Sequence, residues 1–167
     1  MTGEAPTVQR SARAIASVSE YQSALDAVIE HAQHALDLFD YDMHEGGWGS
    51  PQRYELLKRF VLLSPRNQLR IVLHSTDHVR RNCPRLLNFQ RQYSYAVVIH
   101  ETNPEARGMH DPMLIADGRH YVHRFHYEQP RGEQVLHDPD RTQRLMLRFD
   151  EIWQASTVAV TATTLGL

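Results

Sequence analysis

The chain has 167 residues, of which 41% are hydrophobic and 23% charged, and its formal net charge at pH 7 is -2. This length and composition predict one soluble globular domain with a buried core, and the charge balance gives no support for tight nucleic-acid binding, which typically needs a basic domain. The single cysteine, Cys83, excludes an internal disulfide and a cysteine-rich zinc site, and it fits a reducing compartment, most simply the cytoplasm.

The first 18 residues are small, polar and aperiodic, and we expect a loose leader or a short first strand there. They lack the apolar core of a signal peptide. No run in the chain approaches the ~18 apolar residues that a membrane span needs. We therefore expect no membrane insertion and a single domain over residues 19–167.

Helical and extended patterns alternate after the leader. Tyr21, Leu25 and Val28 recur at helical spacing behind Ser19, a candidate cap. Ser50 followed by Pro51 is a typical helix start, and Pro84 predicts a bend or restart in a later helix. The patterns predict helices over residues 19–35, 52–64 and 77–93, and strands over residues 36–43, 67–75 and 95–100.

The second half predicts a hairpin over residues 112–128, because Asp117 and Gly118 suit the two positive-φ positions of a tight turn. Residues 129–137 are interpreted as irregular. Asp138 and Pro139 then start a last helix, and the tail after it is a closing strand or a docked terminus. Alternating βα units followed by a hairpin predict an α/β fold, with a mixed, mostly parallel sheet flanked by helices on both faces.

The stretch 109–128, MHDPMLIADGRHYVHRFHYE, carries the main functional signal. His110 and Asp117 are seven residues apart, as in the phosphodiesterase signature His-x-Lys-x-x-x-x-Asp, but Pro112 occupies the lysine position. With this stretch, the strand over residues 36–43, the helix and strand over residues 57–75 and the final FDEIWQAS helix make an order of features that resembles the phospholipase D superfamily. The match is nearest to its small bacterial branch, in which single-motif chains pair as homodimers.

The resemblance implies that His110 would attack phosphorus, that the partner copy's histidine would protonate the leaving oxygen, and that a lysine would grip the non-bridging oxygens. Pro112 offers neither an ammonium group nor a backbone N–H, and losing one such donor typically costs a factor of about 10²–10³ in rate. The family's Gly-Ser and Asn positions, expected near residues 124–127, and its later Asn-x-Glu pattern are also absent. The chain therefore resembles a degenerate member.

Each candidate residue has two readings. His110 is either a nucleophile or general acid–base, or a histidine at a strand edge. Asp117 is either catalytic or simply selected by turn geometry, and we favour the turn. Trp48, between glycines on a loop, is either an anchor for a partner protein or a residue packed over a cleft.

A substitute for the missing lysine would be a nearby cation. The candidates for ligand binding are Arg119, Arg124 and His123. His120, His123 and His126 cannot converge on a metal within one strand, because a spacing of three sends successive side chains to opposite faces. Help from elsewhere would be needed, for example from His74, His78 or His100, and we predict neither a metal nor another cofactor.

The resulting hypothesis is a non-catalytic, homodimeric binding, scaffold or regulatory module with a residual cleft for a phosphate-containing ligand, open to a protein partner. The alternative is a weak phosphodiesterase or nuclease that uses His110 across a dimer interface.

Overall fold

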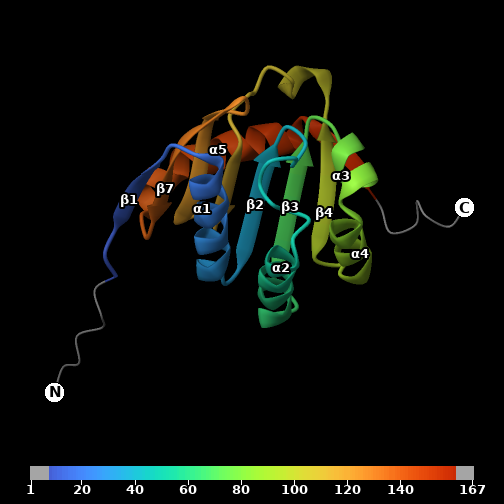
Figure 1. Ribbon diagram of the computed structural model, residues 1–167, viewed down its shortest axis with the longest axis horizontal. Helices are drawn as coiled ribbons and strands as arrows, with labels where there is room; N and C mark the ends of the chain where they lie inside the picture. The colour runs from blue at the N-terminus through green and yellow to red at the C-terminus, as the bar shows by residue number, and fades with distance from the viewer. Residues whose placement is uncertain (1–7, 161–167) are drawn as a thin grey trace, which may run out of the picture.

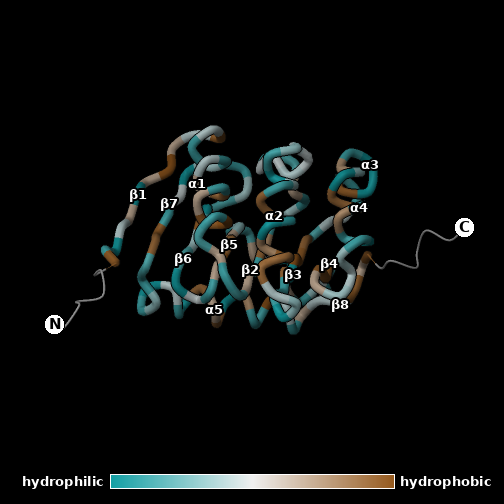
Figure 2. The backbone as a smooth tube through the Cα atoms, turned by 90° about the horizontal axis from the view of Figure 1, so that it is seen from below, coloured by the Kyte–Doolittle hydropathy of each residue, from teal (hydrophilic) through white to brown (hydrophobic). Residues whose placement is uncertain are grey.

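The computed structural model describes residues 8–160, in which one sheet runs through the molecule with helices on both faces (Figures 1 and 2). The strands of this described part are β1 Ser11–Ile15, β2 Ala35–Asp40, β3 Gln68–Leu73, β4 Val97–Thr102, β5 Met113–Ala116, β6 His120–His126, β7 Gln129–Leu136 and β8 Ser156–Val160. The helices are α1 Val18–His31, α2 Pro51–Leu63, α3 Asp77–Asn82, α4 Pro84–Gln92 and α5 Pro139–Gln154, with the short 3-10 helix η1 Pro104–Ala106.

Helix starts follow the expected capping chemistry. The Ser50 and Asp138 side chains accept hydrogen bonds from backbone N–H groups in the first turns of α2 and α5, and proline follows each cap. At α1 the cap is Ser17, whose Oγ accepts from the Glu20 N–H at 3.1 Å, so the prediction of Ser19 was wrong by two residues. Pro84 restarts the helix, which separates α4 from α3.

The strand order is β1-β7-β6-β5-β2-β3-β4-β8. Only β2, β3 and β4 pair in parallel within the described residues, and the other five pairings are antiparallel. The predicted α/β class, mixed sheet and two helical faces are confirmed. The prediction of a mostly parallel sheet was wrong, because two of the seven pairings in the described part are parallel. The parallel part is confined to the three strands that helices connect, because hairpins and edge strands supply the rest.

The segment predicted to be irregular is strand β7, so that interpretation was wrong. Pro130 and Gly132 are strand breakers in sequence, but Gly132 is needed because an added Cβ would lie 2.1 Å from the His123 carbonyl oxygen. Its partner β1 lies within the leader, where a strand was one of the two alternatives. Residues 1–7 of that leader, and the tail from residue 161, lie outside the described part.

The core has two layers, one on each face of the sheet. Helices α1 to α4 cover one face and α5 covers the other (Figure 2). The larger layer includes Leu25, Val28 and Phe60, and the smaller one joins Phe39 and Ile115 to Phe149 of α5. In the described range, none of the helices combines the length and the apolar content that crossing a membrane requires.

The ends of the strands form two opposite edges of the sheet, which we name after the ends of the parallel strands β2, β3 and β4. The carboxyl edge is formed by the segments after β2, β3 and β4, at the top of Figure 1. The amino edge lies opposite, where α1 leads into β2. Strand β5 runs antiparallel to β2, with Met113 beside Phe39 and Ala116 beside Leu36. The chain before β5 therefore lies at the carboxyl edge, and the β5–β6 turn lies at the amino edge.

Candidate functional site

His110 lies at the carboxyl edge, in the exposed segment between η1 and β5. Its carbonyl accepts a hydrogen bond from the Tyr127 N–H at 2.8 Å, which ties this segment to the end of β6. The ring centroids of His126 and Tyr127 lie 5.4 and 5.8 Å from that of His110. In open α/β sheets, ligands bind outside the carboxyl ends of the strands, so His110 occupies a favourable place for binding.

A row of stacked rings continues this edge. Tyr41, directly after β2, stacks on Tyr127 with centroids 4.6 Å apart, and Tyr127 stacks on His126 at 4.8 Å. Tyr41 is exposed, whereas Tyr127 and His126 are half-buried. We call Tyr41, Tyr127, His126 and His110 the ring row. Tyr41 and Tyr127 were missed in the sequence, although the position of Tyr41 after a predicted strand could have signalled it.

His74, after β3, fixes the segment that carries His110. One ring nitrogen, Nδ1, lies 2.7 Å from the Thr102 hydroxyl, and Nε2 lies 2.6 Å from the Met109 carbonyl, to which it donates. Burial lowers the pKa of His74, and the charges of His110 and Arg107 lower it further. His74 is therefore a neutral positioning residue at pH 7, and exposed Arg107 lies close enough to share the edge with His110.

Pro112, at the position where the motif has lysine, has a structural role. Pro112 is buried, and its carbonyl accepts from the Arg124 N–H at 2.9 Å. The only lysine of the chain is Lys58, which lies in α2. No ammonium group therefore follows His110 in the place that phosphoryl transfer would need it.

Asp117 lies at the amino edge, because β5 separates it from His110. The four residues of β5 alone span roughly 13 Å. The Asp117 carboxylate accepts three backbone hydrogen bonds, from the N–H groups of Gln33, His34 and Ala35 at 2.8–2.9 Å. With φ values of +57° and +66°, Asp117 and Gly118 also form the tight turn that the sequence predicted. Asp117 thus joins the turn to the start of β2.

Arg124 is a buried internal residue. Its guanidinium pairs with Glu45 at 2.7 Å and donates to the Gln129 and Tyr127 carbonyls at 2.9 and 3.0 Å. It also lies 4.8 Å from the centre of the Tyr21 ring. The side chain is occupied in holding β6 to the segment after β2, so the structure gives it a structural place in the fold rather than an open ligand surface.

His123 is also held by neighbours. Its Nε2 lies 2.8 Å from Asp111, to which the Nε of Arg148 donates at 2.8 Å as well. Burial alone would raise the pKa of Asp111, but the hydrogen bonds from His123 and Arg148 outweigh it and hold that pKa below its usual value. The carboxylate therefore stays charged and keeps His123 on the α5 side of the sheet.

Two further candidates lie away from His110. Arg119 is exposed at the amino edge, beside the β5–β6 turn. Trp48 is only 3% exposed, and the Arg53 guanidinium lies 4.4 Å from its ring centre. The prediction that Trp48 contacts a partner was wrong, because glycines on both sides allow this loop to fold its tryptophan into the core.

The histidines of β6 do not converge. His120 lies at the amino edge, His123 contacts Asp111, and His126 joins the ring row. Among residues 8–160, no three or more His, Cys, Asp or Glu side chains are arranged to hold a metal ion.

A family model described as a domain of unknown function (DUF7931) matches residues 17–164 of the chain. No curated protein matches the sequence.

Solved structures show where this fold recurs. The phospholipase D family member Nuc from Salmonella typhimurium is 11% identical with a TM-score of 0.64, and the match covers 92% of this chain and all of Nuc. NucT from Helicobacter pylori is 10% identical with a TM-score of 0.60, over 90% of this chain and all of NucT. TrmBL2, an archaeal chromatin protein, is 13% identical with a TM-score of 0.67, over 95% of this chain and 57% of TrmBL2. At these identities the likeness shows a phospholipase D-like fold and no activity.

Proposed function

We propose that this chain, which belongs to the family described as a domain of unknown function (DUF7931), is a non-catalytic, homodimeric binding module with a phospholipase D-like fold. The carboxyl edge binds a phosphate-containing ligand and does not cleave it. As a scaffold or regulatory module, the dimer would act through the ligand or the protein partner that it binds.

The observation that carries this proposal is the buried Pro112 beside the exposed His110. Phosphoryl transfer needs a fixed positive group on the non-bridging oxygens as well as a nucleophile. Of the cations near His110 in sequence, Arg124 and His123 are bound to Glu45 and Asp111. Arg107 is exposed, and within the described residues no ion pair fixes its guanidinium in place. Arg119 lies at the other edge. An imidazole without this support retains a hydrogen-bonding role but loses most of its catalytic value.

The carboxyl edge keeps features that suit binding. The ring row offers the exposed Tyr41 and the His110 imidazole, and Arg107 adds a guanidinium from the same segment. Aromatic faces accept planar groups by stacking, and guanidinium and imidazole groups bind phosphate oxygens. These groups favour a phosphodiester with an attached planar ring over inorganic phosphate alone.

For the dimer we propose an interface centred on Phe125, which is 57% exposed on β6 and precedes His126 of the ring row in the chain. Pairing there would bring two copies of the carboxyl edge together and cover an apolar side chain. Light scattering over a tenfold concentration range should give twice the chain mass. Phe125→Glu should give the mass of one chain, whereas Leu62→Glu, at a similarly exposed position of 58% on α2, should remain dimeric.

The binding proposal is tested with methyl phenyl phosphate, a diester with one planar ring, by following the histidine ring signals in NMR. Saturable changes at His110 and His126 that disappear in Arg107→Gln support it. Signals that stay unchanged in the wild-type protein contradict it. A monomer that still binds the probe would remove the dimer and keep the ligand site.

The alternative activity, a weak phosphodiesterase, is supported by the exposure of His110, which a second copy could reach. It predicts hydrolysis that requires both His110 and the dimer.

A further inference from the structure

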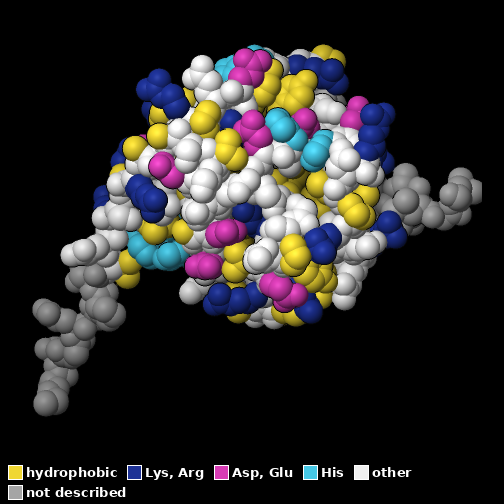
Figure 3. Space-filling model, in the orientation of Figure 1, with side chains coloured by type: hydrophobic (Ala, Val, Ile, Leu, Met, Phe, Trp, Pro, Cys, Tyr) yellow, Lys and Arg dark blue, Asp and Glu magenta, His cyan; other side chains and the backbone are white. Residues whose placement is uncertain are grey.

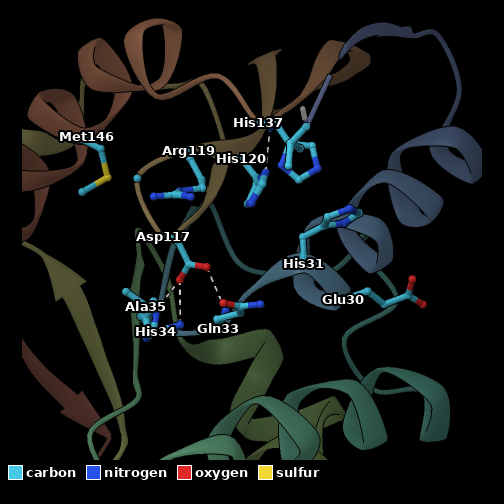
Figure 4. Close-up of a pocket in the computed structure, with 12 residues that line it drawn as sticks. Glu30, His31, Gln33, His34, Ala35, Asp117, Arg119, His120, His137 and Met146 are labelled. Carbon is cyan, nitrogen blue, oxygen red and sulfur yellow. Dashed lines mark hydrogen bonds between the residues drawn. The ribbon is translucent and has the colours of Figure 1, made fainter. Parts of the chain in front are cut away.

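A second group of histidines lies around a cavity of about 610 Å³ at the amino edge (Figure 4). The end of α1, the segment leading into β2, the β5–β6 turn and the start of the β7–α5 connection line it. Figure 3 shows that histidines gather beside the lower end of α1, apart from a second group near α3. This volume is in the range of small-molecule sites, and the cavity is separate from the carboxyl edge.

Three imidazoles meet here from three different elements. His31 comes from α1, His120 from β6, and His137 directly follows β7. Their ring centroids are 5.2 Å apart for His31 and His120, 5.1 Å for His31 and His137, and 4.6 Å for His120 and His137. His137 has a φ of +58°, an uncommon conformation for a residue with a side chain. The fold thus places His137 in this group at a conformational cost.

The ring nitrogens are arranged so that each ring keeps one for the cavity. The Nδ1 of His31 lies 2.7 Å from the Ala27 carbonyl, to which it donates, so Nε2 remains. The Nδ1 of His120 accepts from the His137 N–H at 2.9 Å, which leaves the ring proton on Nε2. His120 is only 3% exposed and lines the cavity, so its Nε2–H is a buried donor available to a bound molecule.

The charges around the cavity favour an anion once the histidines protonate. Burial, and then the charges of His137 and His31, lower the pKa of His120 to about 4. Desolvation, His31 and Arg119 lower the pKa of His137. Figure 4 shows Arg119 between Met146 and His120, above Asp117.

Two acidic groups and a further histidine also line the cavity. The Asp117 carboxylate is occupied by its three backbone donors, while Glu30 is exposed and lies away from the three rings (Figure 4). His34 adds a further titratable ring, and Asp138, next to His137, pairs with Arg10 at 3.6 Å. Arg119 and the imidazoles therefore face the cavity without a free carboxylate among them.

We propose that this cavity is a second binding site, for a small molecule that carries an oxyanion group, either a carboxylate or a phosphate. The Nε2–H of His120 and the Arg119 guanidinium hold the oxyanion, and the imidazoles of His31 and His137 complete the site. Binding takes up protons, because an anion favours the charged imidazoles. Affinity therefore rises as the pH falls, by about tenfold per pH unit while one proton is taken up for each ligand bound.

The test follows the histidine ring signals in NMR during titrations with succinate and with inorganic phosphate, at about pH 5.5 and about pH 7.5, on either side of the ordinary histidine pKa. Saturable changes at His31, His120 and His137, stronger at the lower pH, are expected with at least one probe. The tighter probe identifies the oxyanion.

Variants separate this site from the carboxyl edge. Arg119→Gln should weaken binding at least about tenfold, the loss expected when a charged hydrogen bond is removed. Arg131→Gln, an exposed arginine on β7 that does not line the cavity, and His110→Ala should leave it unchanged. If neither anion shifts the three rings, if Arg119→Gln binds like the wild type, or if Zn²⁺ alone shifts them, the proposal is wrong.

Discussion

The two edges of the sheet divide the features that make an active site. The carboxyl edge holds the motif histidine, His110, which is exposed at the end of the ring row. The amino edge holds the motif aspartate, Asp117, the cavity and three clustered histidines. A signature that is one feature in sequence is thus distributed over both ends of β5. Two residues that are close in a sequence motif can therefore lie at opposite ends of a strand.

The largest effect is expected behind the carboxyl edge, at Arg124. Replacing it in Arg124→Met removes the ion pair with Glu45 and two hydrogen bonds to backbone carbonyls, and it leaves these groups without compensation. We expect a loss of about 3 kcal/mol in the free energy of unfolding, measured by urea denaturation. Arg131→Gln on the neighbouring strand should change it by no more than about 0.5 kcal/mol. Equal effects would mean that Arg124 is not structural.

At the amino edge the corresponding residue is Asp117. Asp117→Ala leaves three backbone N–H groups without their acceptor and places a less suitable residue at positive φ. A loss of about 2–3 kcal/mol is expected in the same measurement. Asp117→Asn keeps an acceptor and tolerates the turn, so it should lose roughly half as much. A wild-type value for Asp117→Ala would contradict the assigned role.

The edges should also differ in the sign of their pH dependence. Burial raises the pKa of Asp40, at the end of β2, to about 6, so the folded state binds more protons there than the unfolded state. Protonation of this carboxyl therefore increases the free energy of unfolding of the protein as the pH falls from about 6 to about 4. His120 has a lowered pKa of about 4, so the unfolded state binds more protons there than the folded state does. Its contribution to the free energy of unfolding therefore falls as the pH falls from about 6.5 to about 4.

Two variants separate these opposing contributions, each about 1–3 kcal/mol. Compared with the wild type, Asp40→Asn should lose more stability on acidification, and His120→Asn should lose less. Asparagine at position 120 keeps an acceptor for the His137 N–H. Denaturation curves collected between about pH 4 and about pH 7 measure both slopes. Changes in slope relative to the wild type that have the same sign in the two variants would contradict this assignment.

Much of the fold could be predicted because its signals are local. The caps at Ser50 and Asp138, the restart at Pro84 and the turn at Asp117 each depend on a few adjacent residues. Strand β7 was missed because its identity comes from pairing with β6 and β1, which outweighs Pro130 and Gly132.

The sites were harder to predict, because they too depend on contacts between residues that are far apart in the sequence. Trp48 looks exposed among glycines, and its burial depends on α2 and α4 packing around it. The sequence pattern groups His120 with its strand neighbours, whereas the rings that it contacts, those of His31 and His137, come from other elements. Only the alternation of the β6 histidines was a local property, and it is confirmed for His120 and His123, which lie on opposite faces.

The most direct measurement of the central claim is hydrolysis of a generic phosphodiester, bis(p-nitrophenyl) phosphate, by the wild-type protein and by His110→Ala. Because His110 is exposed, this variant should fold with a stability within about 0.5 kcal/mol of the wild type, which makes the comparison clean. The account predicts that both proteins release p-nitrophenol no faster than buffer does. Turnover by the wild type that disappears in His110→Ala would show that the carboxyl edge is a working active site.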